Sequence, residues 1–111
     1  MKNKIRLFYA VLAFFLTANV YSGEWHTITD YSLWSNTYED DYIRVRFSTG
    51  YINPSSCSDP DSYMVKDTLT ESSKQRIYST LLAAKMSSKP IRLRIDGCQS
   101  NKPAIINVVL D

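Results

Sequence analysis

The sequence predicts a small, mostly β domain with one helix, folded as a five-stranded barrel. Two segments, residues 42–48 and 91–96, alternate polar and apolar side chains with the period of a half-buried strand. A third segment, residues 71–87, has its apolar side chains at helical spacing. Cys57 and Cys98 are the only cysteines in the chain, and they can cross-link it once.

Residues 1–22 have the pattern of a cleavable secretory signal. A basic start precedes an unbroken apolar run at residues 7–16. Because a helix rises about 1.5 Å per residue, that run covers roughly half of a ~30 Å hydrocarbon core, and a signal fits better than a membrane span. Val20 and Ser22 place the expected cleavage before Gly23. We therefore expect a secreted or periplasmic protein; an uncleaved N-terminal anchor is the alternative.

The remaining residues, 23–111, are expected to form a single domain with almost no net charge. The whole chain has 13 basic and 11 acidic residues, but three of the basic residues lie in the signal segment, so the mature charge is about −1. This balance argues against nucleic acid or anionic lipid as a partner. We also expect no cofactor, because no cofactor-binding motif is present.

The two cysteines are expected to form one intramolecular disulfide after export. Oxidising compartments favour disulfides, and domains this small need additional stabilisation. The loop-entropy model assigns roughly 4 kcal/mol to closing a loop with 40 residues between Cys57 and Cys98. A metal-binding pair or a bridge between two chains is the alternative.

Five strands and one helix are expected along the mature domain. The strands are predicted at residues 25–34, 42–48, 62–66, 91–96 and 104–110, and the helix at residues 71–87. Thr70 is the expected N-cap of the helix, and Pro90 follows its end. The resulting order, β-β-β-α-β-β, is that of an OB-fold barrel, although other small α+β sheets share it.

Three stretches carry a resemblance to a known family. They are the loop around Cys57, residues 78–85 with their continuation at 91–95, and Gly97-Cys98 followed by Pro103. From about Tyr42 onward the chain resembles small exported, disulfide-closed OB-fold proteins of Gram-negative bacteria, similar in plan to the B subunits of subtilase-cytotoxin-like AB5 toxins. The resemblance implies a glycan-binding subunit of a pentameric ring. The present chain is shorter than those subunits, and none of its segments maps onto their sugar pockets.

No catalytic or metal-binding motif is recognisable in the sequence. His26 is the only histidine, and no nucleophile motif accompanies it, so we expect it to have no chemical role and the protein not to be an enzyme. The carboxylates at residues 39–41 and 59–61 could hold calcium, but their spacing differs from that of an EF-hand. Solvated turns are the preferred interpretation of both clusters.

Arginine and tyrosine side chains on the outer faces of two predicted strands are the candidate ligand contacts. They are Tyr38, Tyr42, Arg44, Arg46, Arg92 and Arg94. Guanidinium groups beside aromatic rings can bind anionic sugars, nucleic-acid phosphates or carboxylates of a partner protein. Ordinary solvated ion pairs are the alternative interpretation. Trp25 and Trp34 are expected to lie mainly in the core, because large rings dominate burial in small domains.

These observations favour an exported, non-enzymatic binding module whose ligand is a glycan or a surface polysaccharide. The alternative is a protein-interaction or assembly subunit of a secreted or periplasmic complex, as a homo-oligomer or with a partner protein. Nucleic-acid binding is disfavoured by the near-neutral mature charge and by the expected compartment.

Overall fold

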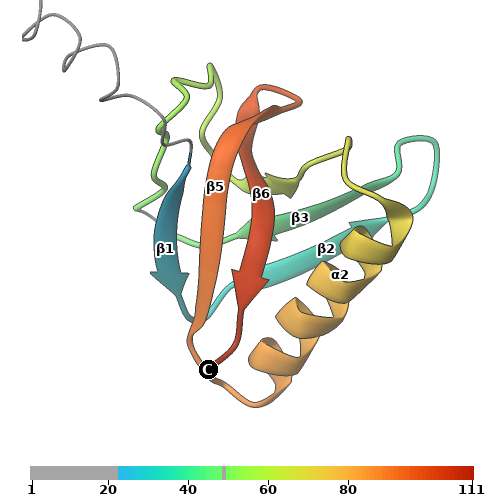
Figure 1. Ribbon diagram of the computed structural model, residues 1–111, viewed down its shortest axis with the longest axis vertical. Coiled ribbons are helices and arrows are strands. Elements are labelled where there is room, and N and C mark those ends of the chain that lie inside the picture. Colours follow the sequence, from blue (N-terminus) through green and yellow to red (C-terminus); the bar gives the residue numbers. More distant parts are fainter. Residues whose placement is uncertain (1–22, 49) are drawn as a thin grey trace, which may run out of the picture.

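Residues 23–48 and 50–111 are described by the computed structural model of the chain (Figure 1). The signal predicted at residues 1–22 lies outside these described residues. Within the described ranges, no helix combines the length and the hydrophobicity that crossing a bilayer requires.

The described residues form a mostly β structure with one helix, which confirms the predicted fold class. The strands are β1 (Glu24–Ile28), β2 (Ser32–Asn36), β3 (Tyr42–Arg46), β4 (Tyr63–Val65), β5 (Ile91–Gln99) and β6 (Lys102–Val109), and the helix is α2 (Glu71–Met86). Thr70 is the N-cap, as predicted, because its hydroxyl accepts a hydrogen bond from the Ser73 N–H at 3.1 Å.

All six strands belong to one sheet in the order β1-β5-β6-β4-β3-β2. The β4–β6 pair is parallel and the other pairs are antiparallel. The sheet is strongly bent: β1, β5 and β6 stand side by side, while β2 and β3 cross behind them at a steep angle (Figure 1). Its two edges, β1 and β2, are not paired with each other, so the sheet is not closed and the predicted five-stranded barrel is not confirmed.

The first strand is wrongly predicted as one continuous segment. It is broken at residues 29–31, where Asp30 adopts a positive φ of 52° that a strand cannot contain. Tyr31 then turns into the core, where only 3% of its surface is exposed, and its hydroxyl donates to the Leu81 carbonyl at 2.6 Å. Lys85 donates to the Tyr31 carbonyl at 2.7 Å. The break is therefore anchored to α2 by two hydrogen bonds.

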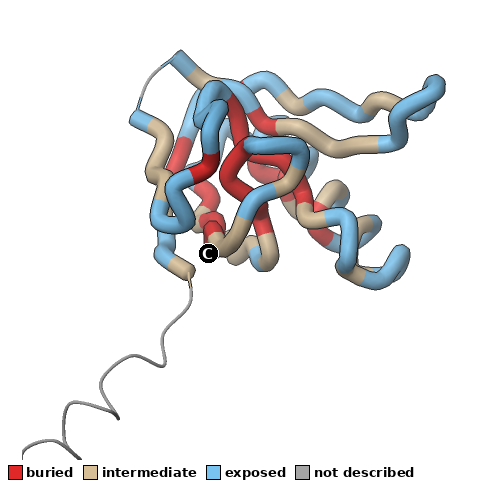
Figure 2. The backbone as a smooth tube through the Cα atoms, turned by 90° about the horizontal axis from the view of Figure 1, so that it is seen from above, coloured by how far each residue is buried: buried red, intermediate tan, exposed pale blue. Residues whose placement is uncertain are grey.

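The core lies on the concave side of the sheet, between the strands and α2. Val45 on β3 and Ile91, Leu93 and Ile95 on β5 are fully buried, as their alternation predicts. Helix α2 contributes Ile77, Leu81 and Ala84 to the same core. Burying each large aliphatic side chain stabilises the fold by about 1.5–3 kcal/mol before entropy is subtracted. Figure 2 shows these buried segments gathered at the centre, with the loops exposed around them.

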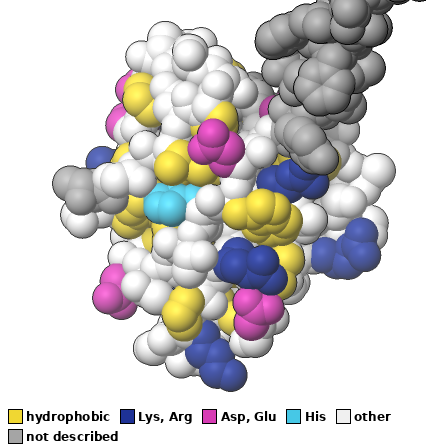
Figure 3. Space-filling model, turned by 60° about the vertical axis from the view of Figure 1, so that its left-hand side comes forward, with side chains coloured by type: hydrophobic (Ala, Val, Ile, Leu, Met, Phe, Trp, Pro, Cys, Tyr) yellow, Lys and Arg dark blue, Asp and Glu magenta, His cyan; other side chains and the backbone are white. Residues whose placement is uncertain are grey.

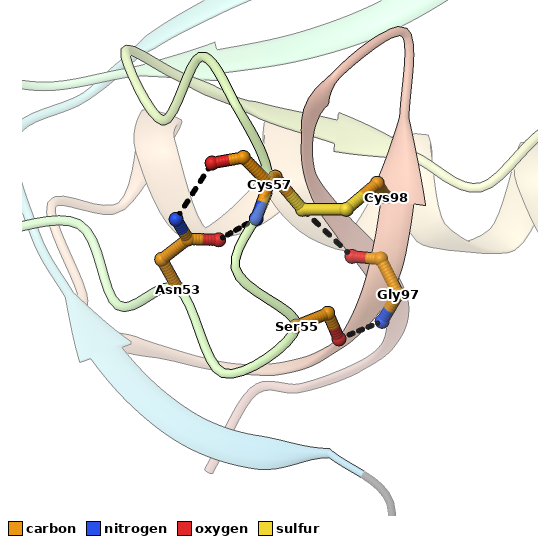
Figure 4. The surroundings of a disulfide bond; sticks show 5 residues. All are labelled: Asn53, Ser55, Cys57, Gly97 and Cys98. Carbon is orange, nitrogen blue, oxygen red and sulfur yellow. Dashed lines mark hydrogen bonds between the residues drawn. A yellow bond between two sulfur atoms is a disulfide. The ribbon is translucent and has the colours of Figure 1, made fainter.

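The predicted disulfide between Cys57 and Cys98 is present (Figure 4). The Cα atoms lie 5.7 Å apart, within the range that a disulfide spans without moving the backbone. Asn53 holds the Cys57 backbone through two hydrogen bonds of 2.8 and 2.9 Å, and the Ser55 hydroxyl accepts from the Gly97 N–H at 2.8 Å. The cross-link and these bonds tie the loop before β4 to the end of β5.

A second contact holds the same loop to β6. The Lys102 ammonium lies 2.7 Å from a carboxylate oxygen of Asp59 and 2.7 Å from one of Asp61, and its side chain is only 9% exposed. The hydrogen bond from Lys102 lowers the pKa of Asp61. Burial alone would lower the pKa of Lys102, but the hydrogen bonds to both carboxylates outweigh it and raise that pKa. The carboxylates at residues 59–61 are therefore paired with a lysine. They are not the unpaired carboxylates of a solvated turn that the sequence predicts.

Candidate functional site

The six predicted ligand contacts fall into two groups on different parts of the sheet. Tyr42, Arg44 and Arg46 lie on β3, and Tyr38 lies in the turn that precedes it. Arg92 and Arg94 lie on β5. Because β6 and β4 separate β5 from β3 in the sheet, the structure does not bring the six residues into one site.

Arg92 and Arg94 share the outer face of β1 and β5 with a tryptophan. Trp25 lies directly opposite Arg94 in the register, and Thr27 lies opposite Arg92. The side chain of Trp25 is 45% exposed, so its predicted place in the core is wrong. Figure 3 shows the side of the molecule that carries β1, where hydrophobic and basic side chains lie next to one another at the surface.

Arg92 connects this tryptophan to the C-terminal residue. Its guanidinium carbon lies 5.4 Å from the centre of the Trp25 ring, in the range of a cation–π contact. The same guanidinium donates two hydrogen bonds to the Asp111 carboxylate, from Nε at 3.0 Å and from Nη2 at 3.2 Å. A two-point contact of this kind fixes the orientation of an arginine. Asp111 therefore holds Arg92, and Arg92 in turn restricts the Trp25 ring.

We call Trp25, Arg92, Arg94 and Asp111 the tryptophan face. It offers an aromatic surface on β1, guanidinium N–H donors on β5 and carboxylate acceptors at Asp111, which follows β6. Two of the five N–H donors of Arg92 are used by Asp111. Asn107 on β6 lies opposite Arg94 and adds an exposed amide to the same row.

Tyr42 and Arg44 line a surface hollow between the β2–β3 hairpin and the β5–β6 turn. Arg44 lies between Trp34 and Met64 in the register, and Trp34 is 45% exposed, contrary to its predicted core position. The Arg44 guanidinium lies 5.1 Å from the Tyr42 ring centre. Its Nε is buried and has no hydrogen-bond partner among the described residues, and its Nη2 lies 4.0 Å from the Met64 sulfur.

The hollow has a volume of about 420 Å³ and a mixed lining. Its residues are Glu39, Asp40, Asp41, Tyr42, Arg44, Met64, Asp67, Gln99 and Ser100. The carboxylates at residues 39–41 are exposed, as expected for a solvated turn. Within the described residues, no three His, Cys, Asp or Glu side chains are grouped so that they could hold a metal ion.

Two of the predicted contacts lie at the ends of this hairpin. Tyr38 is 78% exposed in the turn between β2 and β3. Arg46 is exposed at the opposite end of β3, where it faces Ser32. These positions extend the group along the hairpin and do not concentrate it at the hollow.

His26 lies on the inner face of β1 and takes part in an aromatic cluster. Its Nδ1 lies 2.7 Å from the Tyr63 hydroxyl, which itself accepts a hydrogen bond from the Ile52 N–H at 2.7 Å. The rings of Phe47 and Tyr63 lie 5.7 and 5.8 Å from the His26 ring. Burial lowers the pKa of His26, and burial raises the pKa of Tyr63 to about 12. His26 is therefore held among aromatic rings by its contact with the Tyr63 hydroxyl.

The two exposed tryptophans are the functional candidates that the sequence interpretation missed. Both stand at strand positions whose alternate neighbours are polar: Thr27 shares a face with Trp25, and Ser32 and Asn36 share a face with Trp34. This period of two was the available signal for exposure, whereas the size and hydrophobicity of the two rings favour a core position.

Comparison of this chain with protein-family models, with curated protein sequences and with solved structures finds no match.

Proposed function

We propose that this protein is an exported, non-enzymatic binding module that recognises a glycan at the tryptophan face. The observation that carries the proposal is an exposed tryptophan ring on β1 that contacts Arg92 of the neighbouring strand β5 and lies opposite Arg94 of that strand in the register. Its mature form would act in an oxidising compartment, which is supported by the disulfide between Cys57 and Cys98.

The chemistry of this face matches that of a sugar. One side of a pyranose ring presents C–H groups, which pack on an aromatic ring, while its edge presents hydroxyl groups that need donors and acceptors. Trp25 offers the ring, and Arg92 and Asp111 offer donors and acceptors beside it. Because Asp111 already orients Arg92, less side-chain entropy would be lost on binding.

The proposal extends to the fold. An OB-type arrangement is supported by the parallel β4–β6 pair and by the short connection, residues 29–31, between the two edge strands. If β1 and β2 are taken as the two halves of one bent strand, five strands remain, with that strand at both edges of the sheet. From the likeness to toxin B subunits, this proposal keeps the glycan as the ligand but not the pentameric ring.

A glycan-array screen of the oxidised protein, followed by titration calorimetry of the glycans it retains, tests the proposed function. Trp25→Ala should abolish binding, because it removes the stacking surface. Trp34→Phe is the matched control, since Trp34 is equally exposed but lies on another strand. Absence of binding to every glycan on a broad array would reject the proposal. So would a Trp25→Ala variant that binds the retained glycan with unchanged affinity.

An assembly role is the second candidate function. It is favoured by a separate observation, the unprotected outer edge of β2.

A further inference from the structure

The outer edge of β2 has no neighbouring strand in the described part of the chain. β2 pairs with β3 on one side and ends the sheet on the other. Its residues, Ser-Leu-Trp-Ser-Asn, include neither a charged side chain nor a proline. Sheet edges in monomeric proteins are usually protected by such residues, by a bulge or by a covering segment. The other edge strand, β1, carries the charged residue Glu24. β2 is therefore the edge better suited to pairing with a further strand.

The two ends of β2 carry opposite charge. At its start, Lys85 donates a hydrogen bond to Tyr31, and Lys89 lines a small hollow with the same two residues. Arg46 faces Ser32, the first residue of the strand. Asp30 offsets one of these three positive charges.

At the other end, the chain continues from Asn36 into the acidic turn. Three consecutive acidic residues, Glu39, Asp40 and Asp41, are all exposed there. The strand therefore joins a basic end to an acidic end, and this polarity decides how two copies could meet.

We propose that two copies of this chain form a symmetric dimer in which their β2 strands pair antiparallel, centred on Trp34. A two-fold axis through that residue places the basic end of each strand beside the acidic end of the other, twice. A parallel pairing would bring like charges together. The two Trp34 side chains lie directly opposite each other across the axis, at the spacing of about 4.5–5.5 Å between Cβ atoms that cross-strand pairs adopt.

The shape of the molecule leaves room for this contact. The β2–β3 hairpin projects beyond the buried body of the domain, and its tip is exposed (Figure 2). Trp34 and Ser35 are exposed on it, so the central residues of the edge are accessible to a second copy. The tryptophan face lies on β1 and β5, at the other edge of the sheet, and stays open in the dimer.

Light scattering after size exclusion, with the purified oxidised protein at low salt and rising concentration, measures the mass of the assembly. The wild-type protein should approach the mass of two chains, and Trp34→Lys should return to one, because it places two positive charges opposite each other. Trp25→Lys is the matched control: this tryptophan has the same 45% exposure but lies on β1, and the variant should remain dimeric. The control should lose glycan binding while Trp34→Lys keeps it, so the two proposals fail separately.

A charge exchange provides a second test that leaves the strand itself unchanged. Arg46→Glu and Asp40→Lys should each weaken the dimer about tenfold, and the two together should recover much of the loss. Circular dichroism checks that each variant is folded, and if Trp34→Lys is not, the charge exchange decides. A wild-type protein that is monomeric at every concentration, a mass of three or more chains, or an unchanged mass for Trp34→Lys would overturn the proposal.

Discussion

The hydroxyl of Tyr63 lies 2.7 Å from Nδ1 of His26, in a hydrogen bond across the concave side of the sheet. His26 lies on β1 and Tyr63 on β4, and these strands are separated by β5 and β6 in the sheet order. The bond therefore joins two parts of the bent sheet that no backbone ladder connects directly. The Tyr63 hydroxyl also accepts a hydrogen bond from the Ile52 N–H, so one oxygen contacts both β1 and the loop before β4.

Acid should destabilise the fold through this histidine. Burial lowers the pKa of His26 below its ordinary value of 6.5, so the unfolded chain takes up a proton at a higher pH than the folded one. Stability is then complete above about pH 6.5 and declines as the pH falls toward the lower folded pKa. Urea unfolding at a series of pH values should show this slope, and His26→Phe should remove it. An NMR titration that places the His26 pKa above 6.5 would contradict the prediction.

Removal of the disulfide should lower the free energy of unfolding substantially. Replacement of both Cys57 and Cys98 by serine releases a loop closed across a sequence separation of 41 residues. The expected loss is roughly 4 kcal/mol, as an upper value from loop entropy, measured by urea unfolding at neutral pH. A loss below about 1 kcal/mol would mean that the remaining contacts of the loop hold it without the cross-link.

Lys102→Met should destabilise the loop that carries Asp59 and Asp61. The lysine side chain is 9% exposed, whereas the two carboxylates are more than half exposed and can be hydrated once it is gone. The expected loss in unfolding free energy is about 1–3 kcal/mol. Lys74→Met is a control, since the Lys74 side chain is more exposed than that of Lys102, at 22%, and its partners Asp67 and Glu71 are 72% and 77% exposed. Equal effects of the two substitutions would contradict this account.

Tyr31→Phe should test the anchor between the strand break and the helix. It removes the hydroxyl that donates to Leu81 and leaves a buried carbonyl without this partner, at a cost of about 1–3 kcal/mol. Tyr38→Phe is the matched control, because Tyr38 is 78% exposed and should change stability by less than about 0.5 kcal/mol. Thermal or urea unfolding of the three proteins gives the comparison.

Elements with a regular side-chain period were predictable from the sequence. The inward residues of β3 and β5, the N-cap at Thr70 and the pairing of the two cysteines are all found as predicted. Each depends on local chemistry or on the number of possible partners. These features required no knowledge of which strands are neighbours.

Features that depend on tertiary contacts were not predictable in this way. The break after β1 exists because Tyr31 finds Leu81 and Lys85, which lie about fifty positions further along the chain. The two groups of arginines looked equivalent in the sequence, yet β4 and β6 stand between them. The hydrophobicity of Trp25 and Trp34 predicts a core position for both side chains. The alternation of side chains along each strand, with polar residues two positions away, predicts the exposed position that the structure shows.

The central claim is that the exposed ring of Trp25 is the contact surface for a glycan. In the Trp34→Phe variant Trp25 is the one remaining tryptophan, so its fluorescence reports on this ring alone. Titration of that variant with a glycan retained on the array should shift and saturate the Trp25 emission, with the same dissociation constant as calorimetry gives. Binding by calorimetry with no change in Trp25 emission would show that the glycan binds elsewhere and contradict the claim.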